Sequence, residues 1–248
     1  MDTTRRAEVW LLREADVDGF ARPAAAMLSP DEWARWERLR IESARRRYLG
    51  ARLLSRSVLA AQVGIAPSRL TFSSGEYGRP ELHPNPWRLR FNLTHSEGLI
   101  ACVVTADVLC GIDAERTPAA PAVVRYGTER FAPVERARLG AVEPGVRAVE
   151  FVDTWVLKEA YTKALGFGFQ YGFDTFTLMP DARGDVVVND PRMAASEAGH
   201  WRFTLFTAFT GHRLALALRH SEPVAGRVQV PVRAFPRGEV LHAVPVSV

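Results

Sequence analysis

The feature that most constrains the fold is one long apolar run, GLIACVVTADVLCGID (residues 98–113), which leads directly into the charged residues AER. A run this apolar and rich in β-branched side chains is typical of buried strand structure. The preceding segment, WRLRFNLTHS (residues 87–96), alternates in polarity and predicts a further strand. The sequence therefore predicts a sheet in which a buried strand ends in acidic residues.

Two segments on either side of these strands are predicted to be helical. Residues 29–63 begin with Ser-Pro-Asp-Glu, which resembles an N-cap followed by proline at the first helical position and acids in the first turn. Residues 150–165 carry apolar side chains spaced by four and precede Gly166, a typical helix stop.

One internal similarity indicates the architecture. Trp87-Arg88 precedes an alternating strand, a turn and LIACVV, and Trp201-Arg202 precedes an alternating strand, a turn and LALAL. Convergence of two hairpins could produce the same pattern. It also fits two halves of similar build, each a sheet with a helix. The sequence therefore predicts an α+β protein of two related subdomains that meet at a cleft.

The expected division of the chain follows from this similarity. Residues 1–110 form the predicted N-terminal half and residues 111–222 the C-terminal half. Residues 223–248 form a proline-spaced apolar tail to which the sequence assigns no role.

Composition and charge limit the class of protein. The chain has no secretory signal pattern and no apolar run long enough to span a membrane, so we expect a soluble cytoplasmic protein. Its two cysteines, Cys102 and Cys110, make neither a disulfide framework nor a metal motif. Between Arg35 and Arg56, eight arginines oppose two glutamates, a local net charge of +6. This block suits nucleic acid or a ligand with several phosphates, or it is a solvated helix face.

The candidate chemistry begins with three acids. Asp113 and Glu115 are two residues apart, so on an extended chain both carboxylates face the same side. Like charges this close repel unless a cation lies between them, and hard oxygen ligands favour Mg²⁺. Glu159, on the second predicted helix, could complete an open metal site. The alternative is a strand end that emerges into solvent with two unpaired acids.

The chain's two lysines flank that third acid. Of 32 basic residues 30 are arginine, and the exceptions are Lys158 and Lys163. A compact ammonium suits a phosphate ligand, whereas chance clustering would leave Glu159 and Lys163 as an ordinary surface pair. A lysine beside the acids could therefore neutralise a phosphate.

Three further residues could contact a ligand. Thr94 and His95 leave an alternating strand, and His95 can donate to a phosphate or assist proton transfer near neutral pH. Arg79 lies in a glycine-proline turn, where backbone amides can approach a ligand closely. The alternatives are a partly buried histidine with satisfied hydrogen bonds and a simple turn cation.

Together, GIDAE, WVLKEAYTK, FNLTHS and EYGRP resemble the motifs of the 4'-phosphopantetheinyl transferases of the Sfp type, over roughly residues 29–180. The resemblance implies a pseudo-dimeric monomer of two α+β halves, with coenzyme A and Mg²⁺ in the cleft between them. It also implies transfer of the phosphopantetheine arm of coenzyme A to a serine of an apo acyl- or peptidyl-carrier protein, with release of adenosine 3',5'-bisphosphate.

The resemblance also assigns roles to residues. It implies that Lys163 faces the phosphates of the coenzyme, and we then expect Lys158 to point out of the cleft. Glu159 could be the base, directly or through water. Thr94 stands where the family has serine and Arg79 where it has lysine, and Arg35 or Arg38 would replace lysines of the family's first helix. The N-terminal half would hold the nucleotide and the C-terminal half the metal. The implied metal ligands are Asp113, Glu115 and Glu159; the implied coenzyme contacts are Arg46, Arg79, Thr94, His95 and Lys163; the implied catalytic residues are Glu159, Lys163 and His95.

Two other functions stay open at this point. A metal-dependent nuclease also combines acids with a lysine, but it usually carries Glu-x-Lys on a strand, whereas Glu159 and Lys163 have helical spacing. A non-catalytic carrier-protein or nucleic-acid binding module would use only the basic helix and would not need three acids.

Overall fold

The protein is described here as a computed structural model, which covers residues 7–209, 211–224, 228–241 and 244–246. The chain forms two compact units, one made of Met1–Asp107 with Val230–His242 and the other of Val108–Gln229 with Ala243–Val248. Both units combine a sheet with helices, which confirms the predicted α+β class. No helix in the described part of the chain is both long and apolar enough to cross a membrane.

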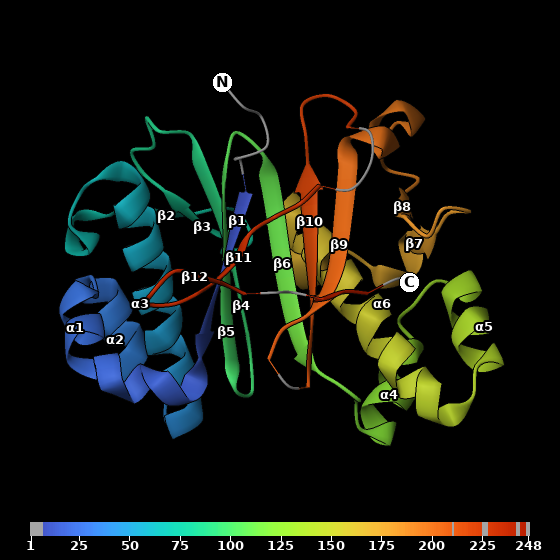
Figure 1. The fold of residues 1–248 in the computed structure, drawn as a ribbon, viewed down its shortest axis with the longest axis horizontal. Coiled ribbons are helices and arrows are strands. Elements are labelled where there is room, and N and C mark those ends of the chain that lie inside the picture. Colours follow the sequence, from blue (N-terminus) through green and yellow to red (C-terminus); the bar gives the residue numbers. More distant parts are fainter. Residues whose placement is uncertain (1–6, 210, 225–227, 242–243, 247–248) are drawn as a thin grey trace. The chain divides into compact units, whose positions relative to one another are not determined.

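The first unit is built on a five-stranded sheet with the order β12-β11-β1-β5-β4. β1 pairs in parallel with β11 and antiparallel with β5, and β5 forms a hairpin with β4. The long helix α3 lies against one face of this sheet (Figure 1), where its leucines pack on apolar side chains of β1, β4 and β5. The elements are β1 (Ala7–Arg13), β4 (Leu89–Ser96), β5 (Leu99–Ala106), β11 (Val232–Ala234), β12 (Glu239–Leu241) and α3 (Glu42–Val63).

Shorter elements complete this unit. A small hairpin of β2 and β3 carries the turn that contains Arg79. The remaining elements are the 3₁₀ segments η2 (Glu14–Phe20) and η3 (Pro67–Arg69), the helices α1 (Ala21–Met27) and α2 (Pro30–Arg38), and the strands β2 (Phe72–Ser74) and β3 (Pro80–Leu82).

The prediction of one helix over residues 29–63 is wrong in one respect, because the helix breaks between α2 and α3 at residues 39–41. The predicted start is confirmed: Ser29 Oγ accepts from Glu32 N, and Glu32 Oε2 accepts from Ser29 N at 2.9 Å. The same carboxylate receives Arg56 Nη2 at 2.6 Å. In one continuous helix these residues would stand about 36 Å apart. The buried ion pair therefore requires α2 to fold back onto α3.

The second unit is built on a four-stranded sheet with the order β13-β9-β10-β6. The long helix α6 covers one face of this sheet (Figure 1), and α4 and α5 precede it in the chain. The sheet and helices are β6 (Leu109–Arg116), β9 (Trp201–Thr207), β10 (His212–Arg219), β13 (Val244–Pro245), α4 (Pro121–Thr128), α5 (Pro133–Ala141) and α6 (Pro144–Leu165). The rest are η4 (Gly168–Gln170), η5 (Phe173–Thr175), η6 (Ala195–His200) and the hairpin of β7 (Thr177–Pro180) with β8 (Val186–Asn189).

The other predicted elements are present with shifted bounds. The apolar run of residues 98–113 holds two strands, β5 and β6, which belong to different sheets, and Asp107 turns between them at φ 58°. The second predicted helix begins earlier, at Pro144, and ends before Gly166 at φ 89°. The predicted C-terminal hairpin is β9–β10, with Gly211 in its turn; Thr210 lies outside the described residues.

The two units repeat one order of elements. In each, a strand is followed by a helix of 22 residues and then by a hairpin, and the last strand lies between the other two. The similarity that starts at Trp87 and Trp201 marks the two equivalent hairpins, β4–β5 and β9–β10. The tail, to which the sequence assigned no role, adds β11 and β12 to the first sheet and β13 to the second.

The Arg56 ion pair gives a first prediction. Arg56 is 1% exposed, and its Nη1 also donates to Pro67 O and Leu70 O at 2.9 and 2.8 Å. Arg56→Met removes the closer cation of Glu32, which keeps Arg52 at 3.6 Å, and takes the donor from the carbonyls of Pro67 and Leu70, so it should lower the free energy of unfolding by about 3 kcal/mol in urea denaturation. Arg46→Met, on the same helix but with exposed acidic partners, should change it by less than about 1 kcal/mol. Equal effects of the two substitutions would contradict this account.

Candidate active site

A backbone contact between α6 and β6 builds the candidate site. A Cβ atom on Gly111 would lie 2.0 Å from Ala160 O and 2.5 Å from Ala164 N, so only glycine fits there. Because strand side chains alternate, Asp113 and Glu115 project from the same face of β6 as Gly111, toward α6. The GIDAE motif therefore presents both carboxylates to the helix.

The helix supplies the other two groups at the same level. Glu159 and Lys163 directly precede the two alanines whose backbone touches Gly111. Lys163 Nζ donates to Asp113 Oδ1 at 2.6 Å and to Ile112 O at 3.3 Å. Glu159 is 3% exposed, so it does not form the ordinary surface pair that chance clustering would give. The second unit thus brings Asp113, Glu115, Glu159 and Lys163 together.

The electrostatics of the cluster favour a further cation. Burial raises the pKa of Glu115 to about 7, and the charge of Asp113 adds to this while Lys163 opposes it. The pKa of Glu159 also rises to about 7, through burial and then through Asp113, again against Lys163. The acids therefore repel one another, and Lys163, with Arg130 acting on Glu159, does not offset the burial and mutual repulsion of the carboxylates.

The donors of this cluster fit Mg²⁺ in their chemistry. Glu159 Oε1 is buried and makes no hydrogen bond to the described part of the chain. No three His, Cys, Asp or Glu side chains among the described residues already converge as a metal site. Mg²⁺ does not need such a cage, because it commonly takes one or two carboxylates and completes its shell with waters and substrate phosphates. The residues therefore fit an ion that arrives with a phosphate ligand.

Lys158 has a different role from the one predicted. It points into the core of the second unit, where it is 0% exposed and its Nζ lies 2.8 Å from Glu135 Oε2. It also donates to Phe173 O and Phe176 O at 2.7 Å each. Burial lowers the pKa of Lys158 and Glu135 raises it. The sequence held no signal for this pair, since its members are 23 residues apart and lie on different helices.

Two arginines of the first unit that were predicted to contact the coenzyme, Arg46 and Arg79, make hydrogen bonds or ion pairs within that unit. Arg46 Nε lies 3.0 Å from Asp18 Oδ1, and its Nη2 lies 3.1 Å from Glu42 Oε1. The hydrogen bond to Asp18 raises the pKa of Arg46. Arg79 Nη2 donates to Phe91 O at 3.2 Å. Both guanidinium groups are therefore already oriented by hydrogen bonds.

Thr94 and His95 occupy successive positions of β4, so their side chains leave opposite faces of the first sheet. Thr94 is 6% exposed, whereas His95 is exposed. Of these two, only His95 is accessible to solvent.

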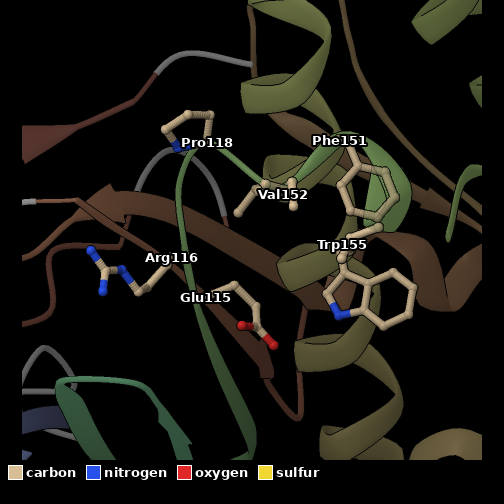
Figure 2. Close-up of a pocket in the computed structure, with 9 residues that line it drawn as sticks. Glu115, Arg116, Pro118, Phe151, Val152 and Trp155 are labelled. Atoms are coloured by element: carbon tan, nitrogen blue, oxygen red, sulfur yellow. The ribbon is translucent and has the colours of Figure 1, made fainter. Parts of the chain in front are cut away.

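A pocket that the sequence did not reveal adjoins Glu115. Its volume is about 290 Å³, and it lies between the segment after β6 and the first half of α6. In Figure 2 the Glu115 carboxylate and the Trp155 indole lie on facing sides of it, while Arg116 extends the other way. Its apolar lining consists of Pro118, Ala119, Ala120, Val123, Phe151, Val152 and Trp155. The spacing of Phe151 and Trp155 predicted only an apolar helix face.

The raised pKa values predict how divalent cation binding depends on pH. Glu115 and Glu159 must lose their protons to act as ligands, and at pH 6 both are largely protonated. Affinity for Mn²⁺, measured by isothermal titration calorimetry, should therefore rise from pH 6 to pH 8, by up to about tenfold per pH unit for each proton released. Glu115→Gln should remove one of the two protons from this dependence. An affinity that is flat with pH would contradict the assignment.

The same shifts predict a stability effect in the metal-free protein. A carboxyl with a folded pKa of about 7 and an ordinary value of 4.5 binds protons more tightly in the folded state, so stability is lost as pH rises from about 4.5 to about 7. Glu159→Gln removes this buried charge. It should raise the free energy of unfolding at pH 8 in chelator by of the order of 1 kcal/mol. At pH 4.5 the gain should be absent, and a gain that is equal at both pH values would point to packing instead of charge.

Comparison with known proteins identifies the family. The model of the 4'-phosphopantetheinyl transferase superfamily matches residues 109–217, which span β6 to β10. The Synechocystis sp. protein slr0495, named as such a transferase, is 31% identical over 185 residues, 72% of each chain. The transferase HetI of Nostoc sp. is 34% identical over 162 residues, 64% of this chain and 68% of its own.

Sfp of Bacillus subtilis (strain 168) is 30% identical over 150 residues, 60% of this chain and 65% of its own. Among solved structures, a Bacillus anthracis holo-(acyl-carrier-protein) synthase in complex with CoA aligns at a TM-score of 0.38 with 18% identity, over 46% of this chain and 98% of that one. On the family match and its relatives, the chain belongs to the 4'-phosphopantetheinyl transferase superfamily.

Proposed function

We propose that this protein transfers the 4'-phosphopantetheine group of coenzyme A to a serine of an apo acyl- or peptidyl-carrier protein and releases adenosine 3',5'-bisphosphate. Membership of the superfamily supports this activity. The observation that carries it is the buried cluster of Asp113, Glu115 and Glu159 around Lys163, a set of groups suited to a cation and phosphates. A nuclease or a binding module is not favoured by the family. We also propose that the protein acts as a cytoplasmic monomer.

We propose that Asp113, Glu115 and Glu159 hold Mg²⁺. When bound, the ion would neutralise charge on the pyrophosphate and orient it. Lys163, which already bridges strand and helix, would also neutralise phosphate charge. The protein itself forms no covalent bond in this reaction, and aligning the two substrates supplies most of the rate acceleration.

Glu159 is the proposed base. The serine oxygen attacks the β-phosphorus, a new oxygen–phosphorus bond forms, and the bond from that phosphorus to the oxygen of the leaving nucleotide breaks. The serine proton passes to Glu159, directly or through a water. In the metal-free protein the pKa of Glu159 is about 7, and a bound cation would lower it, so the carboxylate form that accepts a proton would be present at neutral pH.

The residues of the first unit are proposed to bind the nucleotide end of coenzyme A. Arg46 and Arg79 carry charges that suit its phosphates, and exposed His95 can donate to the 3'-phosphate. Thr94 would add its hydroxyl after a local rearrangement, since it is buried. Arg35 and Arg38 are exposed and could supply further positive charge.

The decisive experiment weighs the carrier. The full chain is incubated with coenzyme A, Mg²⁺ and an apo carrier protein, and the carrier is analysed by mass spectrometry. A gain of one phosphopantetheine group that is lost in chelator is expected. An unchanged carrier mass across fatty-acid, polyketide and peptide carriers would refute the proposal.

Asp113→Ala tests the acid cluster. It should lower kcat/KM for carrier modification by more than about 100-fold, because it removes an oxygen donor and the partner of Lys163. Circular dichroism and the unfolding midpoint should stay close to wild type. A fully active variant would remove Asp113 from the site.

The two lysines should respond differently to the same substitution. Lys163→Arg should lower kcat with little change in stability, because a planar guanidinium group replaces a compact ammonium group next to Asp113. Lys158→Arg should mainly lower the unfolding midpoint, because a larger group is forced into a fully buried site. Equal, small effects of both substitutions on activity and stability would restore the chance explanation of the lysine cluster.

A further inference from the structure

An arginine stands directly opposite one acid of the cluster. In the antiparallel ladder of β6 and β10, Arg213 is paired with Glu115. Side chains at such positions leave the same face with Cβ atoms about 5 Å apart, and opposite charges there normally attract each other. Register alone therefore predicts an Arg213–Glu115 ion pair.

The structure does not contain that pair. Arg213 Nε instead donates to Asp153 Oδ1 on α6 at 2.7 Å. Across the described ranges, Glu115 takes part in no ion pair, and the charges that act on its pKa are those of Asp113 and Lys163. The guanidinium thus pairs with Asp153 and not with the residue directly opposite it on the ladder.

Asp153 lies six residues before Glu159 on the same helix, and its burial costs free energy. The residue is 6% exposed, and burial raises its pKa while Arg213 lowers it. A buried ion pair of this kind adds little net stability compared with apolar residues of similar volume. Its main consequence is to fix where the guanidinium points.

We propose that Asp153 is a positioning residue that holds Arg213 away from Glu115 and so keeps the acid cluster available for a divalent cation. This inference rests on the proposed metal site. With all acids ionised, the three carboxylates and Lys163 carry a formal charge of −3 + 1 = −2. If Arg213 turned to Glu115, that charge would fall to −1 and an oxygen donor would be occupied. Both changes weaken attraction for a divalent ion.

The test compares Mn²⁺ affinity, in the presence of coenzyme A, among the full-length wild type, Asp153→Asn, Arg213→Gln and the double variant. Asp153→Asn should weaken binding about tenfold, because Arg213 is released. Arg213→Gln should bind equally or more tightly, and the double variant should return to near the wild-type value. Asp153→Glu, which keeps a carboxylate for the arginine, should keep wild-type affinity.

A matched control uses the other end of the same strand. Arg219 of β10 pairs with Glu197 at 3.3 Å, so Glu197→Gln also releases an arginine of β10, but away from the cluster. Its Mn²⁺ affinity should equal that of the wild type.

Three results would overturn the inference. If Asp153→Asn binds Mn²⁺ as the wild type does, Arg213 does not compete for Glu115. If Arg213→Gln alone weakens Mn²⁺ binding tenfold, the Asp153–Arg213 pair has only a structural role. The Arg213→Gln measurement decides this even if Asp153→Asn fails to fold. If the wild type itself binds no Mn²⁺, the proposed metal site fails and this inference fails with it, an outcome separable from the first two.

Discussion

The direct contact between the backbone of α6 and strand β6 at Gly111 is the constraint on which the candidate site depends. Any side chain there would meet Ala160 O or Ala164 N and push the helix away from the sheet. Glu159 and Lys163 precede those two alanines, so a shift of the helix would carry both away from Asp113. The small residues Ala215 and Ala217, opposite Asp113 and Gly111 on β10, leave room for the same close packing. Gly111 thus fixes how closely the helix that carries Glu159 and Lys163 approaches the strand that carries Asp113 and Glu115.

Burying these groups weakens the fold locally, whereas another buried ion of the same unit has all its partners. The acids of the cluster have raised pKa values because they lack full compensation. Lys158, the residue next to Glu159, instead pairs with Glu135 and donates to two backbone carbonyls. These contacts join α6 to α5 and to the segment around η5, which follows α6. One helix therefore carries a fully satisfied lysine and an unsatisfied glutamate on adjacent positions. This division is typical of proteins that give up stability at a functional site.

The sequence predicted what local patterns encode and missed what long-range pairing decides. The α+β class, the end of α6 and the N-cap at Ser29 follow from spacing and turn chemistry, and the grouping of GIDAE with Glu159 follows from their charges and from the resemblance. The break between α2 and α3 does not, because the Glu32–Arg56 pair joins residues 24 apart. The partner of Lys158, the choice of Arg213 between two acids and the pocket beside Glu115 likewise depend on how elements pack. Periodicity fixes which face a side chain occupies, but only packing fixes which partner it meets there.

The repeated order of elements carries different charged residues in the two units. Both units place a 22-residue helix on a sheet, but α3 carries arginines such as Arg46 and Arg56, whereas α6 carries Glu159 and both lysines. The strand that precedes α6 ends in the acids of GIDAE, whereas β1, its counterpart before α3, ends in Arg13. A fold does not by itself fix a function, so what each unit can bind follows from its own charged side chains and not from the shared order of elements.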